Sequence, residues 1–385
     1  MFHTDTIVKR WSDRNPYETY FLRENPFPIV PIPEEKPRIF SIHEEVYRKI
    51  LWQLYKVART GRPIHVVVVG PYGSGKTHLL RYLTSYINSH VREGFAAYVP
   101  HPGPDFISIY RHFVGSLGYE RLKALSYSLE KDELRKAIVY QDFVTALVKL
   151  NDPHRTLEAW RWLTANRLTL EERKMLRVAT SIERSEDALN AFSALLKFLR
   201  KVGFKLICLL IDEFEEISSL VQLQKKKLFN DLRHLIDLNV ANFSLIVACS
   251  PQGWNTIYEE NAALVRRFSS NLVFLRPLNE QECVKLISSY LDSYRIHRKA
   301  FQSFLSENGY EGISRTYPFT IDAISEIYAL SKGNVGEVLK YSGIAIEMGA
   351  MEGCTLIDAK ILRSLVARYY GTTMHLWGSN DEVLP

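Results

Sequence analysis

The sequence predicts an α/β fold: a parallel sheet between two layers of helices (αβα), a helical insertion, and an all-helical C-terminal domain. Three observations predict it. Between residues 43 and 277, short apolar runs rich in β-branched residues alternate with stretches of helical periodicity, which is typical of repeated βαβ units. Residues 106–202 carry only helical patterns, and beyond residue 277 no further strand pattern occurs.

The composition is that of a globular protein, because 46% of the 385 residues are hydrophobic and a chain of this length can bury a large core. No apolar run reaches the ~18–20 residues that cross a bilayer, and the first residues do not resemble a leader. We therefore expect a cytoplasmic protein that does not interact with a membrane. The net charge of +6 permits nucleic-acid binding without requiring it. The four cysteines lack metal-ligand spacing and are expected to be reduced core thiols.

Residues 1–42 are expected to form an extended lead-in that packs on the core. Their prolines disfavour a helix. Their aromatic residues indicate an ordered segment, and include Tyr17, Tyr20, Phe21, Phe27 and Phe40. The apolar spacing over residues 43–60 then predicts an amphipathic helix that leads into the first strand.

Four core strands are predicted, each bounded by turn residues. They cover residues 64–69, 95–99, 205–211 and 243–249, and a helix over 222–237 connects the last two. Together they make a core domain over 43–277, with the insertion at about 106–202. Helices over 280–294, 321–331, 335–348 and 357–369 form a C-terminal domain over 278–371, and a tail covers 372–385.

A glycine-rich loop follows the first predicted strand. It reads Gly70-Pro71-Tyr72-Gly73-Ser74-Gly75-Lys76-Thr77, the Walker A or P-loop pattern, and it precedes a predicted helix as that pattern requires. Glycines let the backbone N–H groups and the helix N-terminus face a phosphate. We expect residues 70–78, His78 included, to bind ATP, with Lys76 on the β- and γ-phosphates and the Thr77 hydroxyl on Mg²⁺.

Two carboxylates, Asp212 and Glu213, end another apolar strand, at the edge where open α/β sheets bind their ligands. This is the Walker B position, where Asp212 is expected to hold Mg²⁺ and Glu213 to deprotonate the attacking water. Glu215 and Glu216 are better interpreted as a solvated strand end. We expect the glycine loop and the acidic pair to leave adjacent strands of one sheet.

Three more residues are candidates for catalysis of ATP hydrolysis. Ser250 follows the strand at 243–249 and could bond the γ-phosphate or the water, or only cap the strand end. Arg266 and Arg267 follow a helical stretch. One of them could neutralise transition-state charge in a neighbouring subunit, and the alternative is a pair of surface arginines.

Together these motifs resemble the AAA+ ATPases, within the group of origin-recognition initiators, the ExeA type and transposon-targeting ATPases. The lead-in Tyr20-Phe21-Leu22-Arg23-Glu24-Asn25-Pro26-Phe27 resembles the ExeA type, and Asp212-Glu213-Phe214-Glu215 is similar to the group's Walker B. Residues 162–173 of the insertion resemble ATP-binding proteins of BREX-type anti-phage systems. The resemblance implies an αβα ATPase core, a helical lid, ATP and Mg²⁺ bound between the subunits of a homo-oligomer, and action on DNA or DNA-processing complexes.

Two departures from the family shape this expectation. Gly336 stands where a sensor-2 arginine is usual in the lid, so hydrolysis is expected to be slow. The chain stops after the lid, without room for the winged-helix domain of origin initiators, so DNA contacts would have to come from the core. The cations for such contacts are Lys225, Lys226, Lys227 and Arg233, with Arg111, Arg121 and Lys123 near the insertion.

Blander interpretations stand beside these. The lysine run is also typical of a solvated helix face, and Trp160 and Trp162 fit core positions better than base stacking. The chain could instead be a nucleotide-controlled switch or scaffold that binds a protein partner through the insertion and lid, with little hydrolysis. A small-molecule P-loop kinase is the weaker alternative, because Glu213 suits water activation and no acceptor-binding cluster follows.

Overall fold

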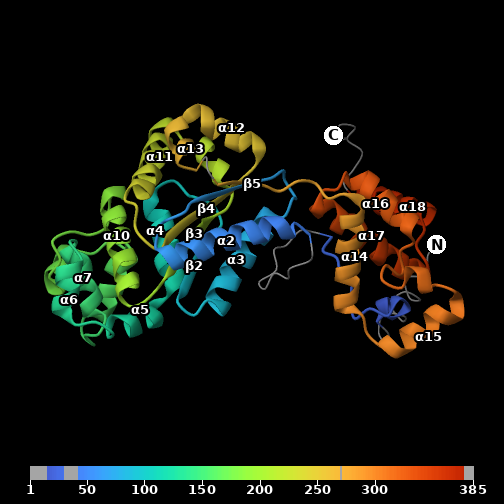
Figure 1. The fold of residues 1–385 in the computed structure, drawn as a ribbon, viewed down its shortest axis with the longest axis horizontal. Helices are drawn as coiled ribbons and strands as arrows, with labels where there is room; N and C mark the ends of the chain where they lie inside the picture. The colour runs from blue at the N-terminus through green and yellow to red at the C-terminus, as the bar shows by residue number, and fades with distance from the viewer. Residues whose placement is uncertain (1–14, 30–41, 269–270, 377–385) are drawn as a thin grey trace. The chain divides into compact units, whose positions relative to one another are not determined.

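A computed structural model describes residues 15–29, 42–268 and 271–376, and its chain divides into two compact units (Figure 1). The sheet unit contains the described residues from 44 to 275. The C-terminal unit contains residues 276–376 together with the described residues up to 43. No helix among the described residues is long and apolar enough to cross a membrane.

A five-stranded sheet of order β2-β3-β4-β1-β5, parallel throughout, forms the centre of the sheet unit. Its strands are β1 (Val66–Val69), β2 (Gly94–Val99), β3 (Leu206–Ile211), β4 (Phe243–Cys249) and β5 (Leu272–Phe274). Four correspond to the predicted strands. The sequence did not predict β5, because its three residues, which lie at the sheet edge, are too few for a periodic signal.

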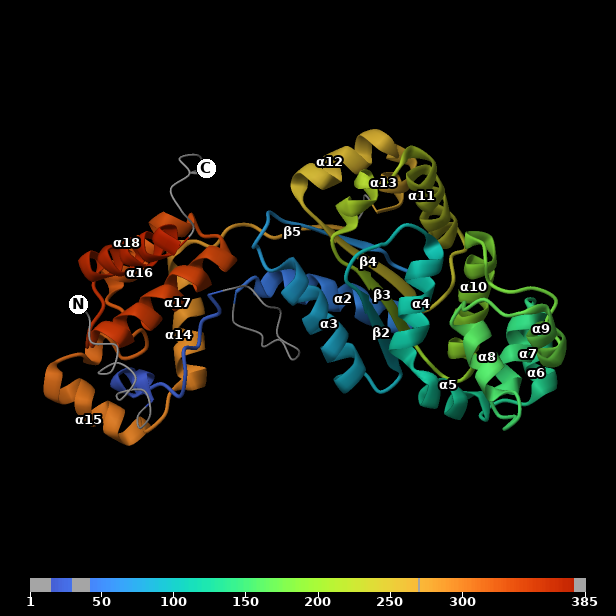
Figure 2. The same cartoon turned by 180° about the vertical axis from the view of Figure 1, so that it is seen from behind.

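Helices cover both faces of this sheet (Figures 1 and 2). Strand residues alternate between two apolar clusters, so that Val66 and Val68 face α2 (Glu44–Thr60) and α3 (Lys76–His90), while Val67 and Val69 face the other layer. The other layer consists of α4 (Phe106–Leu117), α10 (Ser185–Lys201), α11 (Gln222–Asp237), α12 (Pro251–Glu260) and α13 (Ala262–Phe268). The structure confirms the predicted αβα fold.

The insertion is helical throughout and shares one apolar core with the adjoining face of the sheet. Its helices between α4 and α10 are α5 (Tyr119–Ser126), α6 (Lys131–Ala137), α7 (Gln141–Lys149), α8 (Thr156–Leu163) and α9 (Leu170–Leu176). Trp162 is fully buried and its Nε1 donates to the carbonyl of Thr180 at 2.6 Å. Trp160 packs edge-on against Tyr119. Both tryptophans therefore belong to the packing of the insertion rather than to a base-stacking surface.

The C-terminal unit is built of helices around its own apolar cluster. They are α14 (Glu280–Tyr294), α15 (Arg298–Asn308), α16 (Ile321–Ser331), α17 (Val335–Glu352) and α18 (Ala359–Leu376). The sequence did not predict α15, because only Phe301 and Leu305 of its eleven residues are buried and two anchors make a weak periodic signal. The other four agree with predicted helices.

The lead-in differs from its prediction in two ways. Its described part contains a short 3₁₀ helix, η1 (Pro16–Tyr20), because the Asn15 side chain accepts from the Tyr17 N–H and proline is tolerated at a helix start. Its described residues also pack within the C-terminal unit, since Tyr20 and Phe27 are buried in the cluster of the C-terminal helices. Phe40 and the prolines at 31, 33 and 37 lie outside the described residues.

Candidate functional site

The glycine-rich loop spans residues 70–75, between β1 and α3. Gly73 and Gly75 have φ of 75° and 92°, in the left-handed region that favours glycine. At Gly70 a Cβ would lie 2.5 Å from the Ser74 Oγ and 2.9 Å from the Leu275 Cβ. The loop is therefore too tightly folded to accept a side chain at this position.

The start of α3 carries the polar groups of the loop. Gly75 provides no side-chain cap, so the first N–H groups of α3 are open to an anion. Lys76 Nζ donates to the carbonyls of Gly70 and Pro71 at 2.9 and 3.1 Å. Thr77 and His78 follow in the first turn, and Tyr72, 86% exposed, lies on the surface of the loop.

The acidic pair and the glycine loop do not leave adjacent strands, so that prediction is wrong. β4 lies between β1 and β3 and pairs with both, with Val69 opposite Cys249 and Ile211 opposite Val247. The physical reason is that β4, last of the three in sequence, inserts between the earlier two, a topology that spacing along the chain does not reveal. Three strand ends therefore define the site: those of β1, β4 and β3, followed by Gly70, Ser250 and Asp212.

Asp212 is almost completely buried at 1% exposure, and both of its oxygens are held. Its Oδ1 accepts from the Glu213 N–H at 3.0 Å, and its Oδ2 accepts from the Tyr98 hydroxyl at 3.1 Å. Tyr98 lies near the end of β2, and the guanidinium of Arg81 from α3 lies 5.2 Å from the centre of its ring. Burial, followed by the charge of Asp212, raises the pKa of Tyr98 to about 12, so its hydroxyl stays a donor at neutral pH.

Glu213 differs from Asp212 in its surroundings. It is exposed and has a left-handed backbone, φ 46° and ψ 42°, which turns the chain sharply after β3. Partial desolvation and then the neighbouring Glu216, Asp212 and Glu215 raise the pKa of Glu213 to about 7. A carboxylate with a pKa near neutral is suited to accept a proton from water.

Glu215 is not part of a solvated strand end, contrary to its sequence interpretation. It lies in the 3₁₀ helix η2 (Phe214–Ser219), and its Oε1 accepts from the Ser250 N–H at 2.8 Å. A Cβ on Gly253 would lie 2.2 Å from the Glu215 Cβ, so η2 and the start of α12 are in close contact. Glu215 thus links the ends of β3 and β4.

Ser250 begins α12 as its N-cap. Its Oγ accepts from the Gly253 N–H at 3.0 Å, which is the capping role that the sequence left as the alternative. The hydroxyl proton is not used by this bond. Ser250 therefore lies between the other two strand ends, and its hydroxyl can still donate a hydrogen bond.

The two candidate arginines have different environments on α13. Arg267 forms a bidentate ion pair with Asp237 at 2.6 and 2.7 Å and also donates to the Ala263 carbonyl. Arg266 is exposed. Arg267 is thus paired within its own chain, and Arg266 is the more exposed of the two arginines.

The three lysines that were predicted to contact DNA also differ in their burial. Lys225 is 8% exposed, and its Nζ donates to Glu260 at 2.6 Å and to the Ser218 carbonyl at 3.0 Å. Lys225 is therefore a structural cation, and its assignment as a DNA contact is wrong. Lys226 and Lys227 are exposed on the same helix, and Arg233 is half-buried.

Near the insertion, the cations are used in local contacts. Arg111 donates to the Ala165 carbonyl at 2.7 Å. Arg121 lies over the rings of Phe95 and Phe204, each at 5.2 Å, and Lys123 lies 5.4 Å from the ring centre of Tyr119. Arg111 and Arg121 are nevertheless exposed.

Sequence reasoning missed two residues that position the acidic groups, Tyr98 and Glu215. Tyr98 had a usable signal, since a tyrosine next to the end of a predicted strand lies at the same sheet edge as Asp212. Glu215 had none, because its partner is a backbone N–H 35 residues away. Long-range hydrogen bonds of this kind leave no spacing pattern.

The geometry is suited to a nucleotide with a divalent cation. The loop leaves no room for a side chain at Gly70, and the Ser74 Oγ is buried with no hydrogen-bond partner among the described residues. Those residues contain no cluster of three or more His, Cys, Asp and Glu that could hold a metal by itself. A cation here would accordingly combine few protein ligands with phosphate oxygens, as Mg²⁺ does in nucleotide sites.

Comparisons with known proteins identify solved structures that resemble this chain in fold. The ORC2 protein of Aeropyrum pernix, in its ADPNP and ADP complexes, is similar in fold with a TM-score of 0.52 and 14% identity, over 86% of this chain and 69% of that chain. Drosophila ORC bound to DNA gives 0.48 and 12%, over 93% and 67%. A Walker-type ATPase of Pyrococcus abyssi gives 0.44 and 12%, over 91% and 78%.

At the level of sequence, no curated protein matches the chain. The model of the AAA ATPase domain matches residues 45–240, which is just over half of the chain. This range contains the glycine loop, the helical insertion and the acidic pair. The chain therefore belongs to the AAA ATPase domain family and is a nucleotide-binding ATPase.

Proposed function

We propose that the chain binds ATP and Mg²⁺ at the three strand ends and hydrolyses the γ-phosphate with Glu213 as the base. Residues 70–78 would bind the phosphates through backbone N–H groups and Lys76, and Thr77 and Asp212 would hold the metal. Bound Mg²⁺ would neutralise charge on the phosphate oxygens. Glu213 would take the proton of the attacking water, and Ser250 would donate a hydrogen bond to that water or to the γ-phosphate.

One observation carries this proposal: the ends of β1, β4 and β3 lie side by side in one parallel sheet. That edge brings together an anion-binding loop, a hydroxyl donor, a buried carboxylate and an exposed carboxylate of pKa about 7. The different roles proposed for the two carboxylates follow from their different burial. Asp212 is held rigid by two hydrogen bonds, whereas Glu213 is open to water.

We further propose that the protein forms homo-oligomers in which Arg266 supplies positive charge to the nucleotide of the next subunit. Its greater exposure than Arg267 favours Arg266 for this role. We also propose action on DNA or on DNA-processing complexes. The exposed Lys226, Lys227 and Arg121 would contact phosphates, as expected for a sequence-independent, salt-sensitive interaction.

The test of the base assignment is turnover of Glu213→Gln compared with Glu259→Gln, which removes an exposed carboxylate from α12. We expect Glu213→Gln to lower kcat by about 10²–10⁴-fold with ATP binding retained. Glu259→Gln should behave as wild type. Wild-type turnover in Glu213→Gln would overturn the assignment.

The arrangement of subunits is tested by mixing variants. Arg266→Ala should lose turnover, and mixing it with Glu213→Gln should restore part of it, because a mixed interface pairs an intact Glu213 with an intact Arg266. Arg267→Ala is the matched control. It should lower the free energy of unfolding and leave the action of Arg266 on the neighbouring subunit unchanged. Particle mass with and without ATP reports assembly directly, and a monomer at every ATP concentration contradicts the proposal.

The contact with DNA is measured as duplex binding over a range of salt concentrations. Lys226→Gln with Lys227→Gln should weaken binding and flatten its salt dependence, whereas Lys225→Gln should act on stability. Gly336, in the first turn of α17, favours the alternative of a switch that binds a protein partner with little hydrolysis. Partner binding that follows ATP occupancy, together with negligible wild-type turnover, would select that alternative.

A further inference from the structure

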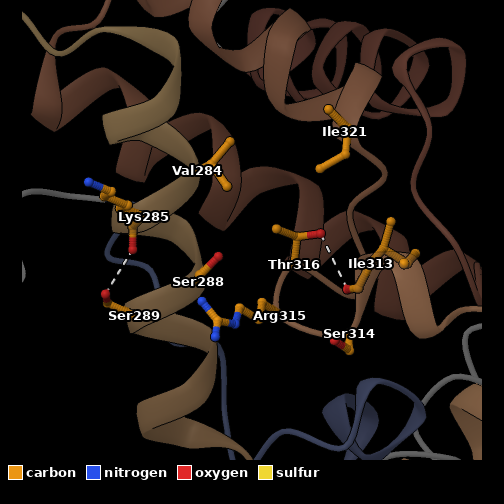
Figure 3. A pocket seen from close by; sticks show the side chains of 10 residues that line it. Val284, Lys285, Ser288, Ser289, Ile313, Ser314, Arg315, Thr316 and Ile321 are labelled. Carbon is orange, nitrogen blue, oxygen red and sulfur yellow. Dashed lines mark hydrogen bonds between the residues drawn. The ribbon is translucent and has the colours of Figure 1, made fainter.

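A cavity lies entirely within the C-terminal unit. Its volume is about 470 Å³, within the range of small-ligand sites. One wall is a face of α14, and the other is the segment that runs from η3 (Glu311–Ile313) to the start of α16. Figure 3 shows this cavity and its lining side chains.

The lining is positively charged and rich in hydroxyls. The charges are Lys285 on α14 and Arg315 on the facing segment, and no carboxylate belongs to the described residues that line the cavity. Figure 3 shows Arg315 extending from its loop toward α14, beside Ser288. Neither cation forms an ion pair or side-chain hydrogen bond with another described residue. Figure 3 shows the Lys285 nitrogen directed away from Arg315 and Ser288, so the Arg315 guanidinium is the charge open to an anion in the cavity and Lys285 adds positive charge at its edge.

Ser288 supplies an independent observation. Its Oγ is buried and has no hydrogen-bond partner among the described residues, whereas the next residue, Ser289, donates to the Lys285 carbonyl at 2.7 Å. A buried hydroxyl without a partner is unfavourable by about 1–3 kcal/mol. An acceptor in the cavity would remove that penalty.

Apolar side chains complete the walls. Val284, Ile313 and Ile321 line the same cavity, and Figure 3 shows them on the side away from the Arg315 guanidinium. A ligand that fits must thus present an anionic head to Arg315 and Ser288 and a less polar part to these side chains. A phosphate ester has this form, since its oxygens accept from guanidinium and hydroxyl groups and its ester carbon lies opposite.

We propose that this cavity binds the phosphate group of a phosphate ester, with Arg315 and Ser288 as its ligands and Lys285 as a nearby positive charge. The ester could be a small phosphorylated molecule or a nucleotide within a nucleic-acid backbone. The proposal does not depend on hydrolysis at the sheet edge. The proposed function places phosphate binding in the sheet unit and assigns no ligand to the C-terminal unit. This cavity would therefore be the second phosphate site of the protein.

The test uses the full-length Lys76→Ala variant, so that phosphate binding at the glycine loop is weakened. Phenyl phosphate is titrated by calorimetry, and a fluorescein-labelled single-stranded oligonucleotide by anisotropy. Arg315→Gln with Lys285→Gln should weaken binding by about tenfold or more, as is usual when charge-assisted hydrogen bonds are removed. The control is Lys299→Gln with Lys360→Gln, which removes the same charge from exposed positions of the same unit and should change little.

Ser288→Ala separates binding from folding. Because its hydroxyl has no partner, the change should leave the melting temperature the same or higher, while phenyl phosphate binds several-fold more weakly. Loss of affinity for phenyl phosphate alone assigns a small phosphate ester, and parallel loss for the oligonucleotide assigns a nucleic-acid backbone. The proposal is overturned if neither probe binds, or if the cavity variants bind both probes like the control.

Discussion

The two units bury charged groups for different purposes. At the sheet edge Asp212, 1% exposed, is held by Tyr98 and a backbone N–H beside an exposed Glu213 whose pKa is raised to about 7. In the C-terminal unit Arg295, 9% exposed, donates to the carbonyls of Tyr20 and Tyr317 at 2.7 and 2.8 Å and so ties the lead-in to the helices. The buried charge at the sheet edge thus has an exposed, titratable neighbour, whereas the buried charge of the C-terminal unit is bound by backbone carbonyls.

The largest effect is expected from Arg295→Met, which removes the buried cation of the C-terminal unit. Two buried carbonyls would lose their donors, which costs about 2–4 kcal/mol. Hydrogen exchange measured by mass spectrometry should show α14 and α17 exchanging at least about 30-fold faster, with the sheet little changed. The control is Arg298→Met, which removes an exposed ion pair with Asp292 and should cost under about 1 kcal/mol. Equal protection in both variants would contradict the role of Arg295.

The second prediction concerns a buried histidine of the sheet unit, which lies at the end of β1 opposite the glycine loop. His65 is buried, and its Nδ1 accepts from the Leu245 N–H at 3.1 Å. Burial lowers the pKa of His65 to about 4, so the unfolded chain binds its proton first as pH falls. The contribution of His65 to the free energy of unfolding should be constant above about pH 6.5 and fall by about 2–3 kcal/mol as pH approaches 4.5, whereas the raised pKa of Glu213 acts with the opposite sign.

Urea unfolding followed by tryptophan fluorescence checks this, since the tryptophans at 52, 160, 162 and 254 lie in the sheet unit. His65→Gln keeps an acceptor and should lose this part of the pH dependence. If wild type and His65→Gln lose the same stability between pH 6.5 and 4.5, the assignment to His65 fails.

The smallest effect is expected at the sheet edge itself, from Tyr98→Phe. It removes one hydrogen bond to Asp212, worth about 1 kcal/mol. The Mg²⁺ concentration for half-maximal ATPase activity should rise about 5–10-fold, because partners of metal ligands tune metal affinity. Stability should change little. Tyr82→Phe on α3 is the matched control, and an unchanged Mg²⁺ requirement in Tyr98→Phe would limit Tyr98 to packing.

Local patterns were sufficient for most of the fold. β3, β4, α11, α14 and α16 agree with their predicted ranges to within a residue, because each joins a clear period to clear boundary residues. The lead-in was misplaced because apolar aromatic residues show that a segment is buried but not against which unit. Arg295, which holds it, carries no sequence signal for that role.

The candidate site divides in the same way. The glycine loop, Asp212 and Glu213 could be proposed from the sequence because each motif consists of neighbours along the chain, so their spacing is itself the signal. Lys225 was misassigned and Glu215 undervalued, because the partner of each lies 35 residues along the chain. A charge run looks the same whether it is solvated or buried.

By itself, the sequence determined that a strand, a glycine-rich loop and a helix follow one another, and that a second strand ends in two carboxylates. Only the tertiary structure decided that β4 and Ser250 lie between them, that Tyr98 holds Asp212, and that the lead-in belongs with the C-terminal helices. The physical reason is that backbone propensity and periodicity act over a few residues. Strand order and side-chain partners are instead set by which surfaces bury best once the whole chain has folded.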